Sequence, residues 1–197
     1  MKKVLNFTFL MKDENIVDVH CAAFFTVIKK RSKDIDSFEY FGFGKNFNGE
    51  LRIDYDRENK FVPTNLHFKD TKEIACGTEI VLLFKDGGYS PPKFNGYGFY
   101  IPQVEQEAKY FEEDSVEKIF CGHGKFFFAT QNGAVFAFGK NIFSSLGLGN
   151  MDCSFQFEPF KIKDFGKVRS VAIGFCHTLF LTESEQVYGC GSNSGKF

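Results

Sequence analysis

The sequence contains no tryptophan, no long apolar run and no excess of either charge. Its 24 basic and 25 acidic side chains nearly balance, which argues against a wholesale binder of nucleic acid or of an anionic membrane. No apolar stretch approaches the roughly 20 residues that a membrane-spanning helix needs. We therefore expect a soluble protein of the cytoplasm or nucleus that contacts no membrane and reads no specific nucleic acid.

The sequence also lacks a convincing secretory signal and a cysteine pattern that is typical of a zinc site. The N-terminal residues 1–15 begin with a lysine pair and a short apolar run, but Asn6 and Thr8 interrupt that run, and charged residues follow it in place of a cleavage site. A leading strand is therefore favoured over a secretory signal. The six cysteines include no Cys-x-x-Cys pair, so a zinc site has no usual scaffold, and we expect no disulfide framework.

Phenylalanine and glycine are abundant, and they form a repeat. The 28 Phe, 7 Tyr and 19 Gly favour a β-rich chain with many turns. Two stretches, 119–149 and 171–193, share one order: a small residue and Gly, an aromatic strand, a turn, and a second strand ending in Gly-x-Asn. In both stretches the two glycines are 17 positions apart, 122 to 139 and 174 to 191, so each stretch is predicted to be a β-hairpin.

Two earlier copies are longer. They open at Ala22 and Gly77 and close at Gly44 and Gly98, and their extra residues lie in 29–36 and 87–93, which we place at hairpin tips. The opening positions 22, 77, 122 and 174 recur at intervals of 55, 45 and 52. A period near 50, with two recognisable strands and room for two more, is typical of a β-propeller blade. The expected units are approximately 16–70, 71–115, 116–167 and 168–197, the last truncated.

Glycine and asparagine have physical uses at the ends of these hairpins. A residue without Cβ lets the backbone turn sharply or approach its neighbour after an aromatic strand. An Asn two residues later is predicted to close an Asx-type turn. Gly191 and Asn193 occupy these places in the last copy. The Gly-rich end of the chain is therefore predicted to be a hairpin end and not a phosphate loop, which would need Gly where Cys190 stands.

The stretch FGKNIFSSLGLGN, 138–150, resembles the G-x-N-x-x-G-Q-L-G-x-G signature of the regulator-of-chromosome-condensation repeat family. Ser144 and Ser145 replace its Gly-Gln pair. FGKNFNGEL, 43–51, matches again, and the A-G-x-x-H-T strand of the family is seen best at 173–178. The repeat-signature residues are Gly44, Asn46, Gly77, Gly122, Gly139, Asn141, Gly147, Gly149, Gly174, His177, Gly191 and Asn193.

This resemblance implies an all-β, incomplete propeller with about three to four blades of a seven-bladed ring. Its open edges would invite self-association or completion by another chain. The implied function is a non-enzymatic protein-interaction module that needs no cofactor. The alternative is a guanine-nucleotide exchange factor, or a fragment of one, for a Ran-type small GTPase. The ultraviolet-sensing members rely on tryptophan clusters, which are absent here.

Cysteine and histidine are not expected to provide a catalytic or metal-binding residue. Cys21, Cys76 and Cys121 each precede the opening Ala or Gly, so we interpret them as a packing register and not as metal ligands. Cys176 and His177 are adjacent and would point to opposite faces of a strand, which rules out a local nucleophile–base pair. His177 is predicted to be a hydrogen-bonded blade histidine.

Two charge clusters remain as candidate partner-binding residues. Lys29, Lys30, Arg31 and Lys33 at an expected hairpin tip form either a nuclear-import or anion-binding patch or a solvated turn. The stretch 103–118, which includes Glu112, Glu113 and Asp114, either meets a basic partner or is simply exposed.

Overall fold

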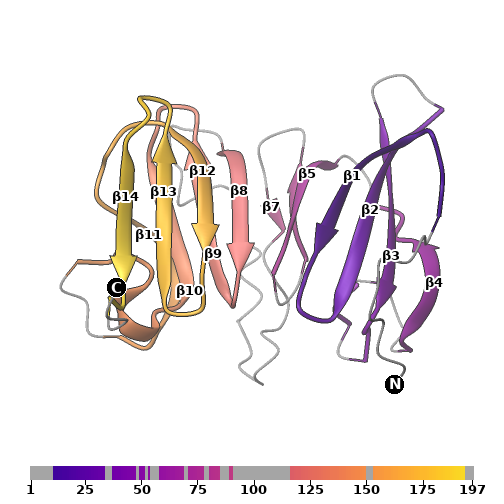
Figure 1. Cartoon of the computed structure of the whole chain (residues 1–197), viewed down its shortest axis with the longest axis horizontal. Helices are drawn as coiled ribbons and strands as arrows, with labels where there is room; N and C mark the ends of the chain where they lie inside the picture. Colours follow the sequence, from indigo (N-terminus) through magenta and orange to yellow (C-terminus); the bar gives the residue numbers. More distant parts are fainter. Residues whose placement is uncertain are drawn as a thin grey trace.

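The computed structural model describes residues 11–33, 37–47, 49–51, 53, 58–68, 71–77, 80–84, 89–90, 116–149 and 153–193. These residues form four antiparallel sheets, which follow one another in sequence order and lie side by side (Figure 1). We call them blades 1 to 4. Within these ranges no helix is long and apolar enough to cross a membrane.

Blades 1 and 3 each contain four strands in consecutive order. Blade 1 consists of β1 (Ile16–Cys21), β2 (Phe25–Arg31), β3 (Phe38–Gly44) and β4 (Lys60–Asn65). Blade 3 consists of β8 (Val116–Gly122), β9 (Lys125–Thr130), β10 (Val135–Lys140) and β11 (Phe155–Lys161), with a 3-10 turn at Ile142–Ser144. Blade 2 comprises β5 (Thr71–Cys76), β6 (Ile80–Phe84) and β7 (Tyr89–Ser90), and blade 4 comprises β12 (Val168–Ile173), β13 (His177–Thr182) and β14 (Val187–Gly191).

The first strand of each blade lies against the first strand of the next. β1 contacts β5, β5 contacts β8, and β8 contacts β12. These four strands therefore form the inner edge of the array, and the later strands of each blade lie progressively further out (Figure 1). This radial arrangement of consecutive antiparallel sheets, with three or four described strands each, is the architecture of a propeller.

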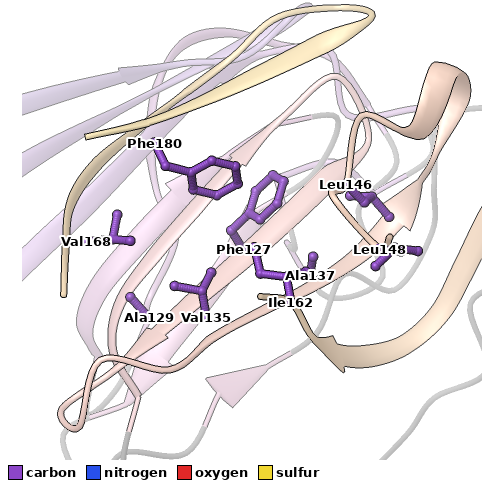
Figure 2. Close-up of a cluster of buried hydrophobic side chains, with 9 residues drawn as sticks. All are labelled: Phe127, Ala129, Val135, Ala137, Leu146, Leu148, Ile162, Val168 and Phe180. Atoms are coloured by element: carbon purple, nitrogen blue, oxygen red, sulfur yellow. The ribbon is translucent and has the colours of Figure 1, made fainter. Parts of the chain in front are cut away.

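Blade 3 is buried on both faces, because blades 2 and 4 cover it. Every described side chain of β9 is buried, unlike the alternating pattern of a sheet with one wet face. Phe126 and Phe128 stack on Phe138, with ring centroids 4.8 and 5.3 Å apart, in the cluster that contains Ala75 of blade 2. The opposite face belongs to the cluster in Figure 2, where Phe180 of blade 4 points at Phe127.

The glycine that closes each hairpin has the same conformation in three blades. Gly44, Gly139 and Gly191 have φ values of 110°, 104° and 107°, a region that side chains rarely adopt. A Cβ on Gly44 would lie 2.6 Å from the Phe24 carbonyl oxygen, and Cβ atoms on the other two would collide with the carbonyl oxygens of Gly124 and Cys176. Those three carbonyls each accept the backbone N–H of the residue after the glycine, at 2.8 to 2.9 Å.

The asparagines act over a wider loop than the Asx-type turn expected from the sequence. Asn46 Oδ1 accepts the N–H of Leu51, and Asn141 Oδ1 accepts the N–H of Leu146, both at 3.0 Å. The bonded amide is five residues on, where an Asx turn would use the second. Both asparagines are buried. Each amide side chain therefore supplies the hydrogen bond that water would otherwise make to the backbone of the loop, which carries a fully buried leucine.

Two segments expected at hairpin tips belong to strands. Lys29–Arg31 lies within β2, which ends only at Arg31, and Tyr89–Ser90 forms β7. The sequence places insertions at tips but does not show how far the flanking strands extend. Val116–Lys118, at the end of the acidic stretch, likewise begins β8. The leading strand expected in 1–10, Gly98, and Glu112, Glu113 and Asp114 lie outside the described residues.

Candidate functional site

The residues that follow the first strand of each blade lie around a common pocket at the inner edge of the array. Blades 1, 3 and 4 make their first turn there, at 22–24, 123–124 and 174–176, and Gly77 follows β5 on the same side. These segments surround a hollow of about 620 Å³. Each blade contributes the last residues of its first strand, so one repeat position lines the pocket four times.

Uncharged residues at the ends of the four inner strands line part of the pocket wall. Blades 1 to 3 contribute Cys21, Cys76 and Cys121, and blade 4 contributes Ile173 at the equivalent position. Burial raises the pKa of the Cys76 and Cys121 thiols, and the neighbouring thiol Cys21 adds to the shift at Cys76, so both remain protonated at neutral pH. A Cβ on Gly77 would lie 3.2 Å from Cys121 Sγ, which shows how closely the inner strands approach.

The three cysteines that share one repeat position in the sequence therefore line one pocket in the structure. The recurrence of Cys21, Cys76 and Cys121 is visible in the sequence, but we did not predict that they meet at one hollow. The signal was available, because the residue that ends an innermost strand lies near the axis in every blade. Across the part of the chain that the structure describes, no group of three His, Cys, Asp or Glu side chains is arranged to hold a metal ion.

The rim of the pocket is aromatic. Phe24 is 68% exposed and Phe175 is 59% exposed, although both are large apolar side chains. The His123 ring stands edge-on to Phe175, with ring centroids 5.9 Å apart. His123 also has a positive φ of 49°, because it occupies the tight turn between β8 and β9. The turn therefore aims the imidazole at the mouth and not along a strand beside Cys121.

One ion pair lies at the pocket wall. Lys45 Nζ is 3.0 Å from Glu50 Oε1 and 5.1 Å from the centroid of the Phe24 ring. The Glu50 side chain is only 6% exposed, whereas that of Lys45 is 35% exposed. The pair is therefore asymmetric: the Glu50 side chain is buried, and the Lys45 side chain is partly exposed beside the exposed Phe24 ring.

A buried lysine ties blade 3 to the pocket turn of blade 4. Lys125 Nζ donates to the carbonyl oxygens of Gly174 and Phe175, at 2.7 and 2.8 Å. The residue is 1% exposed, and this burial lowers the pKa of its ammonium. These bonds fix the turn that presents Phe175, and they occupy two carbonyls that would otherwise face the mouth.

His177 holds the position in blade 4 that Lys125 holds in blade 3, since each pairs with its hairpin glycine across the sheet. Its imidazole packs against Gly174, where a Cβ would approach ring atoms to 2.8 Å. Within the described ranges its side chain makes no hydrogen bond, and the residue is exposed. The predicted hydrogen-bonded histidine is thus a packing residue, because the adjacent glycine leaves room for the ring.

The basic cluster lies at the other end of blade 1 from the pocket, and two of its four charges, those of Lys29 and Lys30, contact other side chains. Lys30 Nζ is 2.5 Å from Asp13 Oδ2, an interaction that lowers the pKa of that carboxyl, and it lies 5.1 Å from the Phe41 ring. Lys29 Nζ lies 4.1 Å above the Phe38 ring. The structure does not bring these cations to the pocket.

The sequence of blades 3 and 4 matches known family models. Residues 132–181 and residues 168–195 each match the Regulator of chromosome condensation (RCC1) repeat. Residues 132–195 therefore carry RCC1 repeats. The predicted family is confirmed on the stretch that carried the motif, Phe138 to Asn193.

Relatives of these RCC1 repeats include regulators of GTPases. The chain is 30% identical over 132 residues to the X-linked retinitis pigmentosa GTPase regulator homolog of Caenorhabditis elegans, covering 62% of the chain and 9% of that relative. It is 33% identical over 91 residues to the secretion-regulating guanine nucleotide exchange factor of Bos taurus, covering 46% of the chain and 20% of that protein. The chain thus spans a minor part of each.

A solved structure shares this fold. The crystal structure of yeast RCC1 (Prp20) bound to Kap60 matches with a TM-score of 0.67 and 17% identity, covering 91% of this chain and 42% of that one. The predicted fold class, an all-β propeller of the RCC1 type that forms part of the ring, is confirmed.

Proposed function

We propose that this RCC1-repeat chain is a non-enzymatic protein-interaction module that binds its partner on the pocket face. The observation that carries the proposal is the set of exposed rings there. The third strands of blades 1 and 3 end beside the pocket turns, and the loops that follow carry Phe47 and Phe143, 71% and 62% exposed. With Phe24 and Phe175 they give one face four large apolar side chains that water covers poorly.

Other features of this face support the same function. The turns are held by backbone hydrogen bonds and by Lys125, so the rings project from a rigid scaffold and little ordering is needed on binding. Yeast RCC1, which shares the fold, was crystallised with the protein Kap60. The proposal places the chain in the cytoplasm or nucleus.

The test compares rim variants with a matched control. Phe24→Ser with Phe175→Ser removes both rings at exposed positions, and Phe61→Ser removes a ring that is 92% exposed on the outer strand β4. The proteins captured from cells by the chain and by each variant are quantified by mass spectrometry. We expect a set of partners that the double variant loses and Phe61→Ser keeps. Identical sets for all three proteins would contradict the proposal.

A second candidate is nucleotide exchange on a Ran-type small GTPase, favoured by the similarity to the exchange factor of Bos taurus. Exchange needs no nucleophile or cofactor. It needs a surface that binds the nucleotide-free GTPase more tightly than the loaded form. The measurement is release of labelled GDP from a Ran-type GTPase on addition of the chain. Unaccelerated release at micromolar concentration would rule this candidate out.

Self-association is a further part of the proposal. Val17 and Val19 of β1 are 47% and 50% exposed, and Leu179 and Val187 of blade 4 are 44% and 65% exposed. These two end faces are the ones that another blade would cover. We expect light scattering to give a mass above that of the monomer, and a cooperative monomer at high concentration would contradict it.

A further inference from the structure

We propose that the pocket binds one apolar side chain of an acidic peptide segment, with a carboxylate next to that anchor pairing with Lys45. The inference rests on the proposed interaction function and specifies the chemistry of the partner. It depends on three observations: the size of the hollow and the uncharged inner-strand residues that line it, its aromatic rim, and the asymmetry of the Lys45–Glu50 pair.

The hollow suits an apolar anchor. Its volume of about 620 Å³ lies within the range of pockets that enclose a ligand group. Small residues such as Ala22, Gly77 and Gly122 leave that space open, and the buried thiols add no charge. Phe24 and Phe175 stand at the mouth and would cover the stem of an inserted side chain. Insertion would release water from apolar surface on both partners, as at the centre of an interface hot spot.

The charge at the mouth selects an acidic neighbour. The Lys45 side chain is 35% exposed while the Glu50 side chain is 6% exposed, so an approaching segment reaches the lysine before the glutamate. A basic segment would meet the Lys45 ammonium as a like charge and reach Glu50 only by displacing it.

The probe is a random heptapeptide library displayed on phage and selected against the immobilised whole chain. Counter-selection uses Ala23→Trp, which puts a large ring into the pocket from an exposed position. We expect the enriched peptides to carry an aromatic or aliphatic residue next to Asp or Glu. Enrichment of Lys-rich or Arg-rich peptides, or of none that Ala23→Trp rejects, would overturn the proposal.

The most enriched peptide is then synthesised with fluorescein, and binding is measured by anisotropy. We expect at least about tenfold weaker binding to Ala23→Trp, and about threefold to tenfold weaker binding to Lys45→Gln. Phe61→Ser should bind within about twofold of the parent chain. Because Lys45→Gln also removes the cation beside the buried Glu50 side chain, binding is measured as well for the double variant Lys45→Gln with Glu50→Gln. Parent-like binding by that double variant would overturn the role of Lys45.

The outcomes separate this inference from the interaction function. If the rim variants lose their cellular partners but no acidic peptide is selected, the interaction function stands and the inferred partner chemistry is wrong. If partners are captured equally by the rim variants and no peptide is selected, both are wrong.

Discussion

Blades 3 and 4 present the same strand register to very different surroundings. Phe127, Ala129, Val135 and Ala137 form one face of the β9–β10 hairpin, and each is at most 4% exposed. The equivalent residues of the β13–β14 hairpin are Leu179, Leu181, Val187 and Gly189. Leu179 and Val187 are 44% and 65% exposed.

The contrast shows which properties belong to each repeat unit and which depend on the neighbouring blades. Both hairpins have an apolar face at the same register, so the pattern is a property of each copy. Burial is not, because the blade 3 face is covered by Phe180 and Val168 of blade 4. In a repeat array, the interface between neighbours supplies much of the stability that a single unit lacks.

The strongest test of this contrast truncates the equivalent positions Phe127 and Leu179. Phe127→Ala removes a fully buried ring that meets Phe180 edge-on, with centroids 5.2 Å apart. We expect it to lower the free energy of unfolding by about 3–5 kcal/mol. Leu179→Ala, at a half-exposed site, should lower it by less than about 1 kcal/mol. Urea denaturation followed by circular dichroism measures both, and equal losses would show that blade 4 is covered in solution.

Substitution of the closing glycines should cost similar stability in blades 3 and 4, because the conformation of each glycine depends on contacts within its own hairpin. Gly139→Ala and Gly191→Ala both place a methyl group against a carbonyl oxygen at positive φ. We expect each to cost about 3 kcal/mol, with similar values in the two blades. Gly149→Ala is the control, since it has a φ of 70° and nothing within 4 Å, and it should cost about 1–2 kcal/mol. A harmless Gly191→Ala would contradict this.

Lys125 and His177 occupy the same repeat position in blades 3 and 4, and we expect a smaller difference in stability when each is replaced. Lys125→Met leaves the Gly174 and Phe175 carbonyls without their donor, and we expect a loss of about 1–3 kcal/mol. His177→Met replaces an exposed ring and should cost less than about 0.5 kcal/mol. Thermal melting of both variants measures the two effects. Equal shifts in Tm would show that the lysine bonds add nothing.

Thiol chemistry should distinguish the blades without changing stability. Burial raises the pKa of Cys121 well above its usual value, so little thiolate forms in the folded state. At pH 8.5 we expect iodoacetamide to label Cys121 at least about ten times more slowly than Cys176, and equally fast in denaturant. Mass spectrometry of the peptides measures the rates. Equal labelling of the folded chain would contradict the enclosed wall.

The same shift predicts a pH dependence. In the unfolded chain the thiols of Cys76 and Cys121 lose protons above about pH 8.5, whereas the folded chain retains them. The unfolded state therefore binds fewer protons, and stability falls as pH rises through that range. Cys76→Ala with Cys121→Ala should flatten the fall, as read from denaturation midpoints between pH 8 and 10. An unchanged slope would assign the pH dependence to other groups.

The hairpins were predictable because their determinants are local. A glycine with φ above 100° ends the second strand of the hairpin in three blades, and the spacing of 17 residues between the two hairpin glycines identified both later copies. The extent of β2 was not predictable, since pairing with β1 and β3 decides where a strand ends. The Asn141 contact five residues on was missed for a similar reason, because it depends on the path of the whole loop.

The repeat, its register and the all-β propeller architecture could be read from the chain alone, because each of these follows from residues within one unit. Three other features required the packed blades: four blade openings meet at one pocket, Lys125 reaches the carbonyls of the next blade, and Glu50 is hidden while Lys45 is not. The pocket and the Lys125 bonds depend on neighbours about 50 residues away in the chain, and the exposure of each charge depends on what packs around it. A local pattern specifies which face is apolar, and the packing of blades decides what covers it.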